Sequence, residues 1–179
     1  MNKTTITFHS GLDSIGGVIM EVHYGDCRVF FEAGTAYDPA FDIFDGKVKT
    51  RKNIIKDLLW IGQIPKIDGI YAKRYVGEIP GLLPAEGYPI RDQAFFISHL
   101  HLDHMRMMGL ISPSVKVCLK ESAQTIERAL EDVGMGIEDL RDHRYEDLKE
   151  ETVIGEIRIH TFVLNSDSYQ DLSFFIETP

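Results

Sequence analysis

The sequence has little of three features that would assign it to well-known classes of protein. It has two cysteines in 179 residues, Cys27 and Cys118, which argues against a disulfide framework and predicts two reduced thiols in the core. No apolar run approaches membrane-spanning length, and no signal-peptide pattern opens the chain. Lysine and arginine number 19 against 28 aspartates and glutamates, so a broad basic surface is not expected. These absences favour a cytoplasmic protein with no membrane partner.

What is present indicates one domain of mixed α/β class. Hydrophobic residues make up 44% of the chain and charged residues 26%, without an internal repeat or a linker. Gly25-Asp26 lies between two apolar runs and predicts a hairpin turn. The expected strands are 6–8, 18–24, 28–32, 94–97, 115–119, 157–162 and 172–176. The expected helices are 53–61, a helix start within 105–110, and 121–133 with Gly134 as its stop signal. Interposed strands and helices predict a layered fold.

Residues 98–104 read Ser-His-Leu-His-Leu-Asp-His and directly follow an apolar strand pattern. Seven histidines in the whole chain make three within six residues improbable by chance. Histidine and aspartate are common ligands of zinc. Side chains two residues apart in an extended segment project to the same side, so His99 and His101 can hold one ion. A turn into a helix then directs Asp103 and His104 toward a second position.

This Ser-His-x-His-x-Asp-His pattern resembles the signature of the metallo-β-lactamase superfamily. The resemblance implies an αββα sandwich and hydrolysis of esters, thioesters, lactams or phosphodiesters by one or two metal ions, usually zinc, with manganese as the alternative. It implies that His99 and His101 bind the first ion, and that Asp103 and His104 bind the second. Asp103 is also implied to position the nucleophilic water, which makes it the candidate catalytic residue.

Three N-terminal segments resemble the opening of ribonuclease J-like, β-CASP-type proteins. They read Phe-His-Ser-Gly at 8–11, Ile-Gly-Gly at 15–17 and Phe-Phe-Glu-Ala-Gly-Thr at 30–35. In those proteins the third segment usually reads Phe-Asp-x-Gly, and its aspartate supports the metal-binding loop. Glu32 takes that place here and has a longer side chain. The implied substrate is RNA or another phosphodiester. The motif alone leaves a lactone, thioester or lactam hydrolase open as the alternative.

Two departures from the family pattern point to an incomplete metal site. Ser166 falls where relatives carry a further histidine ligand, and a serine hydroxyl is a poor ligand for zinc. Asp167 is adjacent and reaches a metal only if the loop shifts. The family's bridging aspartate and final histidine would follow Pro179. We therefore expect residues 1–179 to form only the N-terminal half of the αββα sandwich, with hydrolysis impaired in this chain.

Half a sandwich is expected to expose the apolar inner face of one sheet, and such faces are normally covered. This expectation leaves a second hypothesis beside the metal-dependent hydrolase. The chain would then be a truncated, non-catalytic half-domain that acts by forming a homodimer or by pairing with a complementing chain. Metal content and phosphodiesterase activity test the first hypothesis, and the oligomeric state and the binding of an apolar dye test the second.

Overall fold

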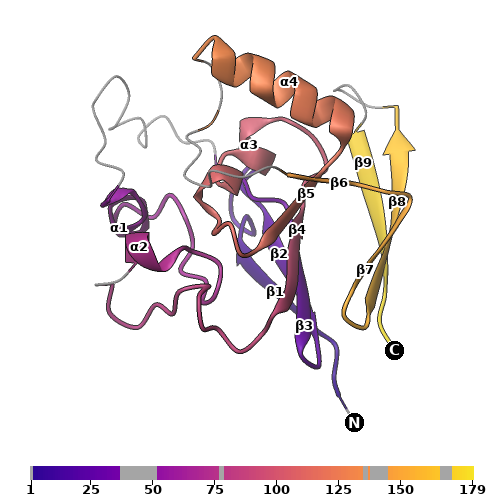
Figure 1. Ribbon diagram of the computed structural model, residues 1–179, viewed down its shortest axis with the longest axis horizontal. Coiled ribbons are helices and arrows are strands. Elements are labelled where there is room, and N and C mark those ends of the chain that lie inside the picture. The colour runs from indigo at the N-terminus through magenta and orange to yellow at the C-terminus, as the bar shows by residue number, and fades with distance from the viewer. Residues whose placement is uncertain (1, 37–51, 77–78, 135–136, 138–144, 166–170) are drawn as a thin grey trace.

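The computed structural model describes residues 2–36, 52–76, 79–134, 137, 145–165 and 171–179. In these ranges the chain forms a six-stranded sheet, a three-stranded sheet and a layer of helices (Figure 1). The prediction of a mixed α/β class is therefore confirmed. The two sheets face each other, and the helices lie on the far side of the larger sheet.

The six-stranded sheet combines an antiparallel meander with parallel strands. Its strands, in spatial order, are β1 (Thr5–Ser10), β2 (Ile19–Tyr24), β3 (Cys27–Phe31), β4 (Asp92–Phe96), β5 (Lys116–Leu119) and β6 (Glu146–Asp147). The first three strands run antiparallel, whereas β3 to β6 run parallel. Gly25 has a φ of 58° and starts the two-residue turn between β2 and β3, so the predicted hairpin is confirmed.

The three-stranded sheet is antiparallel and consists of β7 (Glu151–Ile154), β8 (Ile157–Leu164) and β9 (Asp171–Glu177). The sequence predicted β8 and β9 but missed β7, which lies next to a strongly acidic segment. Its strand state depends on pairing with β8, where Glu151 lies opposite His160 and Ile154 opposite Ile157. Local propensity does not report such a partner, which explains the omission.

The helices are short, and they cover one face of the larger sheet. They are α1 (Ile54–Trp60), α2 (Lys73–Val76), α3 (Leu102–Met105), the 3₁₀ turn η2 (Met108–Leu110) and α4 (Glu121–Asp132). Gly134, with a φ of 74°, follows α4 and confirms the predicted stop signal. None of the helices in the described ranges combines the length and the apolar character needed to cross a bilayer.

The larger sheet is apolar on both faces, which explains the continuous apolar run in β4. Phe30 and Phe95 stack with ring centroids 4.4 Å apart on the helical side. Their neighbours Phe31 and Phe96 lie 5.6 Å apart and face the second sheet. The side chains alternate because successive residues of a strand point to opposite faces. The β3 and β4 strands are thus held from both sides.

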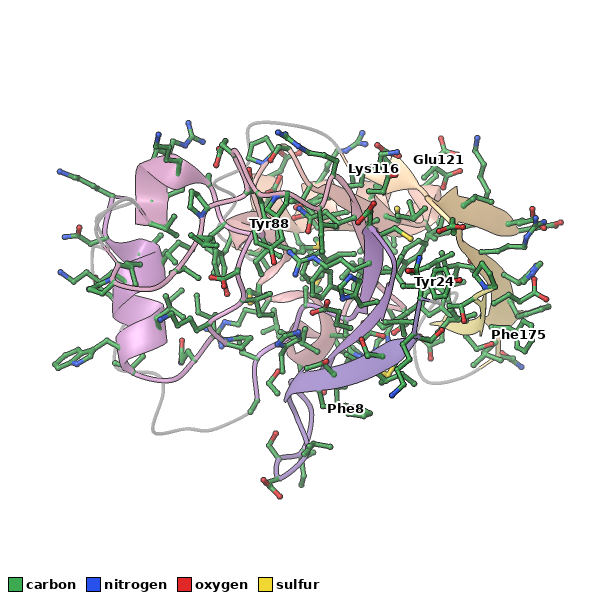
Figure 2. The ribbon with its side chains drawn as sticks, turned by 90° about the horizontal axis from the view of Figure 1, so that it is seen from below. Phe8, Tyr24, Tyr88, Lys116, Glu121 and Phe175 are labelled. Carbon is green, nitrogen blue, oxygen red and sulfur yellow. The ribbon has the colours of Figure 1, made fainter. Side chains whose placement is uncertain are left out.

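The chain itself covers the inner face of the larger sheet over its central strands β3 and β4. Phe174 of β9 packs against Phe31 at 5.3 Å and against Phe96 at 5.9 Å. The expectation of an exposed inner face is therefore wrong over β3 and β4, where β7 to β9 supply a facing sheet. It holds at β1, where Ile6 and Phe8 lie on the inner face opposite Val22 and Met20 and are 61% and 47% exposed. Further exposed apolar side chains lie on the outer face of β7–β9, where Figure 2 shows Phe175. They are Val153, Phe162, Leu164 and Phe175.

The two cysteines lie in the apolar layer between the sheets. Cys27 and Cys118 are buried and not joined in a disulfide, so the prediction of two reduced core thiols is confirmed. Cys27 Sγ donates to the backbone oxygen of Tyr24 at 3.0 Å. Both thiols serve packing, which is the usual role of a buried free cysteine.

Candidate metal centre

The motif at residues 98–104 lies at the C-terminal ends of the parallel strands β3 and β4. Ligand sites of α/β sheets are found at this end of the strands. The backbone of the motif is tied to the segment that follows β3. Ala33 N donates to His104 O at 2.8 Å, and Met107 N donates to Ala33 O at 2.6 Å. Gly17 N donates to Asp103 O at 2.9 Å and so ties the motif to the β1–β2 loop as well.

Two glycines allow these segments to approach each other closely. A Cβ added to Gly34 would lie 1.6 Å from the backbone oxygen of Asp103. A Cβ added to Gly16, whose φ is 72°, would lie 2.3 Å from Asp103 Oδ2. Because neither position has room for a side chain, glycine is required at both. Gly16 and Gly34 belong to two of the N-terminal segments that the sequence singled out, and their role is to support the motif.

The structure brings the three histidines of the motif together. The ring centroids of His99 and His101 are 4.6 Å apart, and those of His99 and His104 are 4.1 Å apart. Asp103 Oδ2 lies 3.4 Å from His104 Nε2. All four predicted site residues therefore share one location beyond the end of β4. His101 occupies the N-cap position of α3 without a side-chain capping bond, and this helix turns Asp103 and His104 away from the direction of the strand.

The Nδ1 atoms of two histidines have polar neighbours that orient the rings. Ser98 Oγ and His99 Nδ1 form a hydrogen bond of 2.8 Å. Glu32 Oε2 lies 3.4 Å from His104 Nδ1, an ion-pair distance without the geometry of a hydrogen bond, and accepts from Ser98 N at 3.3 Å. A metal-binding histidine commonly uses one ring nitrogen for the metal and the other for such a partner. These contacts leave Nε2 as the ring nitrogen of His99 and His104 that is available to a metal ion.

Glu32 is held in an uncommon backbone conformation. Among the described residues other than glycine, it alone has a positive φ, of 65°. This left-handed conformation costs of order 1–3 kcal/mol for a residue with a side chain, and such strain is concentrated at functional sites. The conformation places the carboxylate beside both Ser98 and His104. Glu32 thus contacts the loop that the aspartate of the family pattern supports.

The surroundings set the protonation of the imidazoles. Burial lowers the pKa of His99, and the positive charge of His104 lowers it further. The pKa of His104 is raised, first by the Glu32 carboxylate and then by the charge of Asp103, against the effect of burial. His99 is therefore kept in the neutral form that binds metals, whereas His104 retains a proton more readily in the absence of a metal.

One pair of donor atoms fits a divalent ion as it stands. Two ligands of a tetrahedral zinc ion with bonds of about 2.0–2.1 Å are separated by roughly 3.3–3.5 Å. The distance of 3.4 Å between Asp103 Oδ2 and His104 Nε2 matches this separation. Within the described ranges, however, no group of three or more histidine, cysteine, aspartate or glutamate side chains is arranged to hold an ion. The described side chains thus offer one pair of donor atoms at ligand spacing and not a complete set of ligands.

The structure adds a carboxylate that the sequence did not suggest. Asp171 is the first residue of β9, and 8% of its surface is exposed. Its negative charge acts on both His99 and His104. The two residues that were considered in place of the missing histidine, Ser166 and Asp167, lie outside the described residues.

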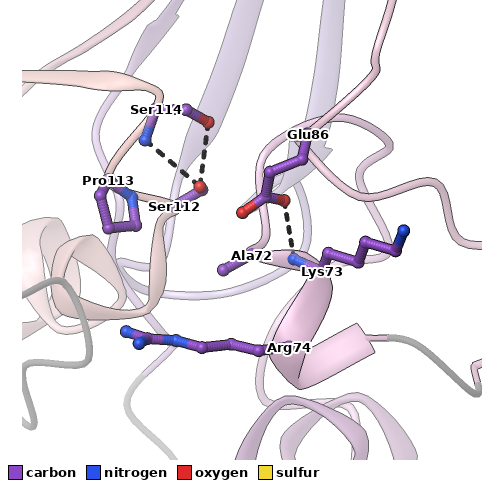
Figure 3. Close-up of a pocket in the computed structure, with 7 residues that line it drawn as sticks. All are labelled: Ala72, Lys73, Arg74, Glu86, Ser112, Pro113 and Ser114. Carbon is purple, nitrogen blue, oxygen red and sulfur yellow. Dashed lines mark hydrogen bonds between the residues drawn. The ribbon is translucent and has the colours of Figure 1, made fainter.

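A separate pocket of about 700 Å³ lies near α2 and the loop that precedes β5 (Figure 3). Its polar groups bind one another: Glu86 Oε2 accepts from Lys73 N at 2.7 Å, and the hydroxyl groups of Ser112 and Ser114 are 3.0 Å apart. It is lined by Ala72, Lys73, Arg74, Glu86, Ser112, Pro113 and Ser114. The motif at 98–104 contributes none of these residues, so the pocket is distinct from the histidine group.

Comparison with known proteins reveals a similar structure without an assigned function. No protein-family model and no curated protein matches the sequence. A protein of unknown function from Enterococcus faecalis V583 has 29% identity and a TM-score of 0.78, with 99% of this chain and 41% of that chain covered. This chain thus spans less than half the length of that protein.

Two metallo-β-lactamases show a weaker likeness. The MIM-2 enzyme has 15% identity and a TM-score of 0.47, and the match covers 91% of this chain and 51% of the MIM-2 chain. An enzyme of Cronobacter sakazakii has 11% identity and a TM-score of 0.46, with 91% and 49% covered. Neither likeness reaches a TM-score of 0.5, so the proposals below rest on the geometry of this chain.

Proposed function

We propose that this chain is a metal-dependent hydrolase domain of the metallo-β-lactamase type that acts on phosphodiester bonds, RNA among them. The observation that supports the proposal is the grouping of His99, His101, Asp103 and His104 at the C-terminal ends of β3 and β4. Ring nitrogens that point away from the site have polar partners at Ser98 and Glu32. In a surface loop that is rich in histidine by chance, we would not expect polar side chains to orient the rings in this way.

Each residue of the group has a defined task in the proposed reaction. His99 and His101 would hold one divalent ion, and Asp103 with His104 would hold a second, either zinc or manganese. When bound, such ions would supply activation of a water molecule and stabilisation of the charge that develops on the scissile group. Asp103 would also accept a hydrogen bond from the attacking water and so orient it. Glu32 fixes the ring of His104, while Gly16 and Gly34 keep Asp103 close to the strand ends.

The metal content of the purified protein tests the proposal, together with hydrolysis of bis(p-nitrophenyl) phosphate and of a short RNA. The variants His99→Ala and Asp103→Asn are expected to lose metal and at least about 100-fold in activity, the upper end of the loss for an indirect metal contact. His160→Ala is the matched control, because His160 lies on the three-stranded sheet and contacts Glu177 at 2.8 Å. A protein that binds neither zinc nor manganese and cleaves neither substrate would contradict the proposal.

The class of substrate is tested with the same metal-loaded protein. We expect the phosphodiesters to be cleaved at least ten times faster than a lactone, a thioester or a lactam offered at equal concentration. Preferential cleavage of one of these three compounds would keep the hydrolase and replace the phosphodiester. A nuclease remains compatible with the net charge of −9, because bound divalent ions supply positive charge at the site itself.

A second candidate function, association with another copy of this chain, is favoured by the outer face of β7–β9. Val153, Phe162 and Phe175 are each more than half exposed on this one face. Arg158 lies beside the carboxylate of Glu151 at 2.8 Å on the same face, so two copies can match opposite charges across a twofold axis. Light scattering that shows a monomer at high concentration, without binding of an apolar dye, would exclude this candidate.

A further inference from the structure

Four large apolar side chains are exposed close together between residues 6 and 15. Ile6 and Phe8 of β1 are 61% and 47% exposed. Leu12 and Ile15, in the loop that follows β1, are 71% and 90% exposed. Figure 2 shows Phe8 at the rim of the molecule. Exposed apolar residues that gather in one place mark an interaction surface, whereas singly scattered ones do not.

The strand that carries Ile6 and Phe8 is also an edge strand. β1 pairs with β2 on one side, and in the described ranges no strand pairs with its other side. β9 reaches β1 at Thr4, whose Oγ1 lies 2.7 Å from Thr178 Oγ1. The register with β2 is regular from Thr5 to Phe8 and shifts only beyond Phe8. This bulge at the end of β1 leaves a stretch of regular strand with a free edge, which is able to pair with another chain.

The charges of the edge strands distinguish β1 from the others. Acidic side chains on an edge strand oppose pairing between copies of a chain whose net charge is −9. β1 reads Thr-Ile-Thr-Phe-His-Ser and contains no acidic side chain. Two copies can therefore approach along β1 without bringing carboxylates together. The other edge strands in the described part of the chain all contain acidic residues: Glu146 and Asp147 in β6, Glu151 in β7, and Asp171 and Glu177 in β9.

We propose that β1 pairs with β1 of a second copy of this chain, antiparallel and about a twofold axis at Thr7. This register places Ile6 opposite Phe8 of the other copy, so that each of these exposed side chains gains an apolar cross-strand neighbour. It also places Lys3 opposite Gly11 of the other copy, two positions from Asp13, so that opposite charges adjoin. The two six-stranded sheets then form one continuous sheet.

The proposed contact is independent of the surfaces described above. It involves neither the histidine group nor the outer face of β7–β9, which is the surface of the second candidate function. The backbone hydrogen bonds of the new strand pair supply affinity, and the Ile6 and Phe8 pairs fix the register. The partner is a second copy because self-pairing of β1 satisfies both its free edge and its exposed apolar residues.

Sedimentation velocity over a range of protein concentrations measures the association. Ile6→Lys introduces a charge into the apolar contact from both copies at once, and lysine on an edge strand opposes pairing. We expect it to raise the dissociation constant of the dimer at least about 10-fold, because like charges that face each other across an interface are unfavourable. Phe175→Lys is the matched control. Phe175 is 57% exposed, close to the 61% of Ile6, but lies on the outer face of β7–β9, so the dimer should be unaffected.

A cross-linking experiment tests the register itself. Thr7 is exposed and lies on the proposed twofold axis. Residues directly opposite each other in an antiparallel pair have Cα atoms about 4.5–5.5 Å apart, a separation that a disulfide spans. Thr7→Cys is therefore expected to link two copies on mild oxidation. Thr125→Cys, at an exposed position of α4, is the control and should stay unlinked. The natural thiols, Cys27 and Cys118, are buried and do not compete.

Two results of the sedimentation experiment would overturn the inference. One is a protein that stays monomeric at its highest soluble concentration. The other is a dimer that Phe175→Lys dissociates and Ile6→Lys leaves intact, which would assign the contact to the outer face of β7–β9. If Ile6→Lys does not fold, cross-linking decides, and linkage of Thr7→Cys no faster than that of Thr125→Cys overturns the proposal. None of these measurements involves a metal, so the proposed hydrolase is tested separately.

Discussion

The two sheets of this protein differ in how many of their faces are buried, and the candidate site follows a strand of the sheet with two buried faces. The six-stranded sheet packs against the helices through Phe30 and Phe95 and against the second sheet through Phe31 and Phe96. The three-stranded sheet buries its inner face, while apolar residues on its outer face are exposed. The histidine loop follows strand β4 of the doubly buried sheet, where packing fixes the segments that contact the loop.

Matched truncations of phenylalanine test this difference, and the largest effect is expected in the doubly buried sheet. Phe96 is fully buried and contacts the rings of both Phe31 and Phe174. Phe96→Ala should lower the free energy of unfolding by about 3–5 kcal/mol, because it leaves a cavity between the sheets. Urea denaturation measures this value. A loss below about 1 kcal/mol would show that the facing sheet is not tightly packed.

The second prediction concerns the contact between the histidine loop and the end of β3. Gly34→Ala must push the backbone of Asp103 away, because the new Cβ would lie 1.6 Å from its oxygen. We expect a loss of about 2–4 kcal/mol, comparable to other severe overpacking, together with loss of metal binding. Thermal melting and metal content measure the two effects. Gly62→Ala is the control, because it meets no atom within 4 Å and has only the strain of its φ of 74°.

The third prediction compares a buried charged residue in the larger sheet with an exposed ion pair in the smaller sheet. In the larger sheet Glu21 is 8% exposed and accepts a hydrogen bond from His9 at 2.7 Å. Burial by itself would raise the pKa of Glu21, but the bond from His9 and the charge of Arg28 outweigh it, and the pKa is lowered from 4.5. Glu21→Gln should therefore cost about 1.5–3 kcal/mol at neutral pH, the range for hydrogen bonds to charged groups.

The pH dependence of this loss follows from the lowered pKa. A carboxyl group of this kind stabilises the fold above its unfolded pKa, and the contribution disappears as the pH falls through the folded pKa. The difference between the protein and Glu21→Gln should be constant near neutrality and shrink below about pH 4.5. Arg158→Gln is the control in the smaller sheet. Its ion pair with Glu151 is half exposed, so we expect about 0–1 kcal/mol. Equal losses in both variants would contradict the comparison.

The smallest effect is expected on the outer face of the three-stranded sheet. Phe175 is 57% exposed there, so Phe175→Ala removes little buried area. In a monomer we expect a change within about 0.5 kcal/mol, as for ordinary surface substitutions. The measurement is the same urea denaturation that is used for Phe96→Ala. A loss of several kcal/mol that grows with protein concentration would reveal a partner on this face and would favour the second candidate function.

The local elements could be predicted where a short stretch of sequence contains all the necessary information. The turn at Gly25, the apolar strand β4 and the end of α4 before Gly134 were all predicted correctly. The grouping of the histidines could also be predicted, because the motif is contiguous and follows a buried strand. The strand β7 was missed, because its four residues become a strand only through pairing with β8. Long-range pairing of this kind is invisible to local propensity.

By itself, the sequence determined which side chains the histidine loop brings together and which strand leads into the loop. Residues a few positions apart have their relative placement set by the periodicity of strand and helix, so the spacing within 98–104 was sufficient. Only the tertiary structure decided that Gly34 must be a glycine and that Glu32 lies beside His104. These relations depend on how the β3–β4 edge and the second sheet pack, and packing depends on side chains that are distant in the chain.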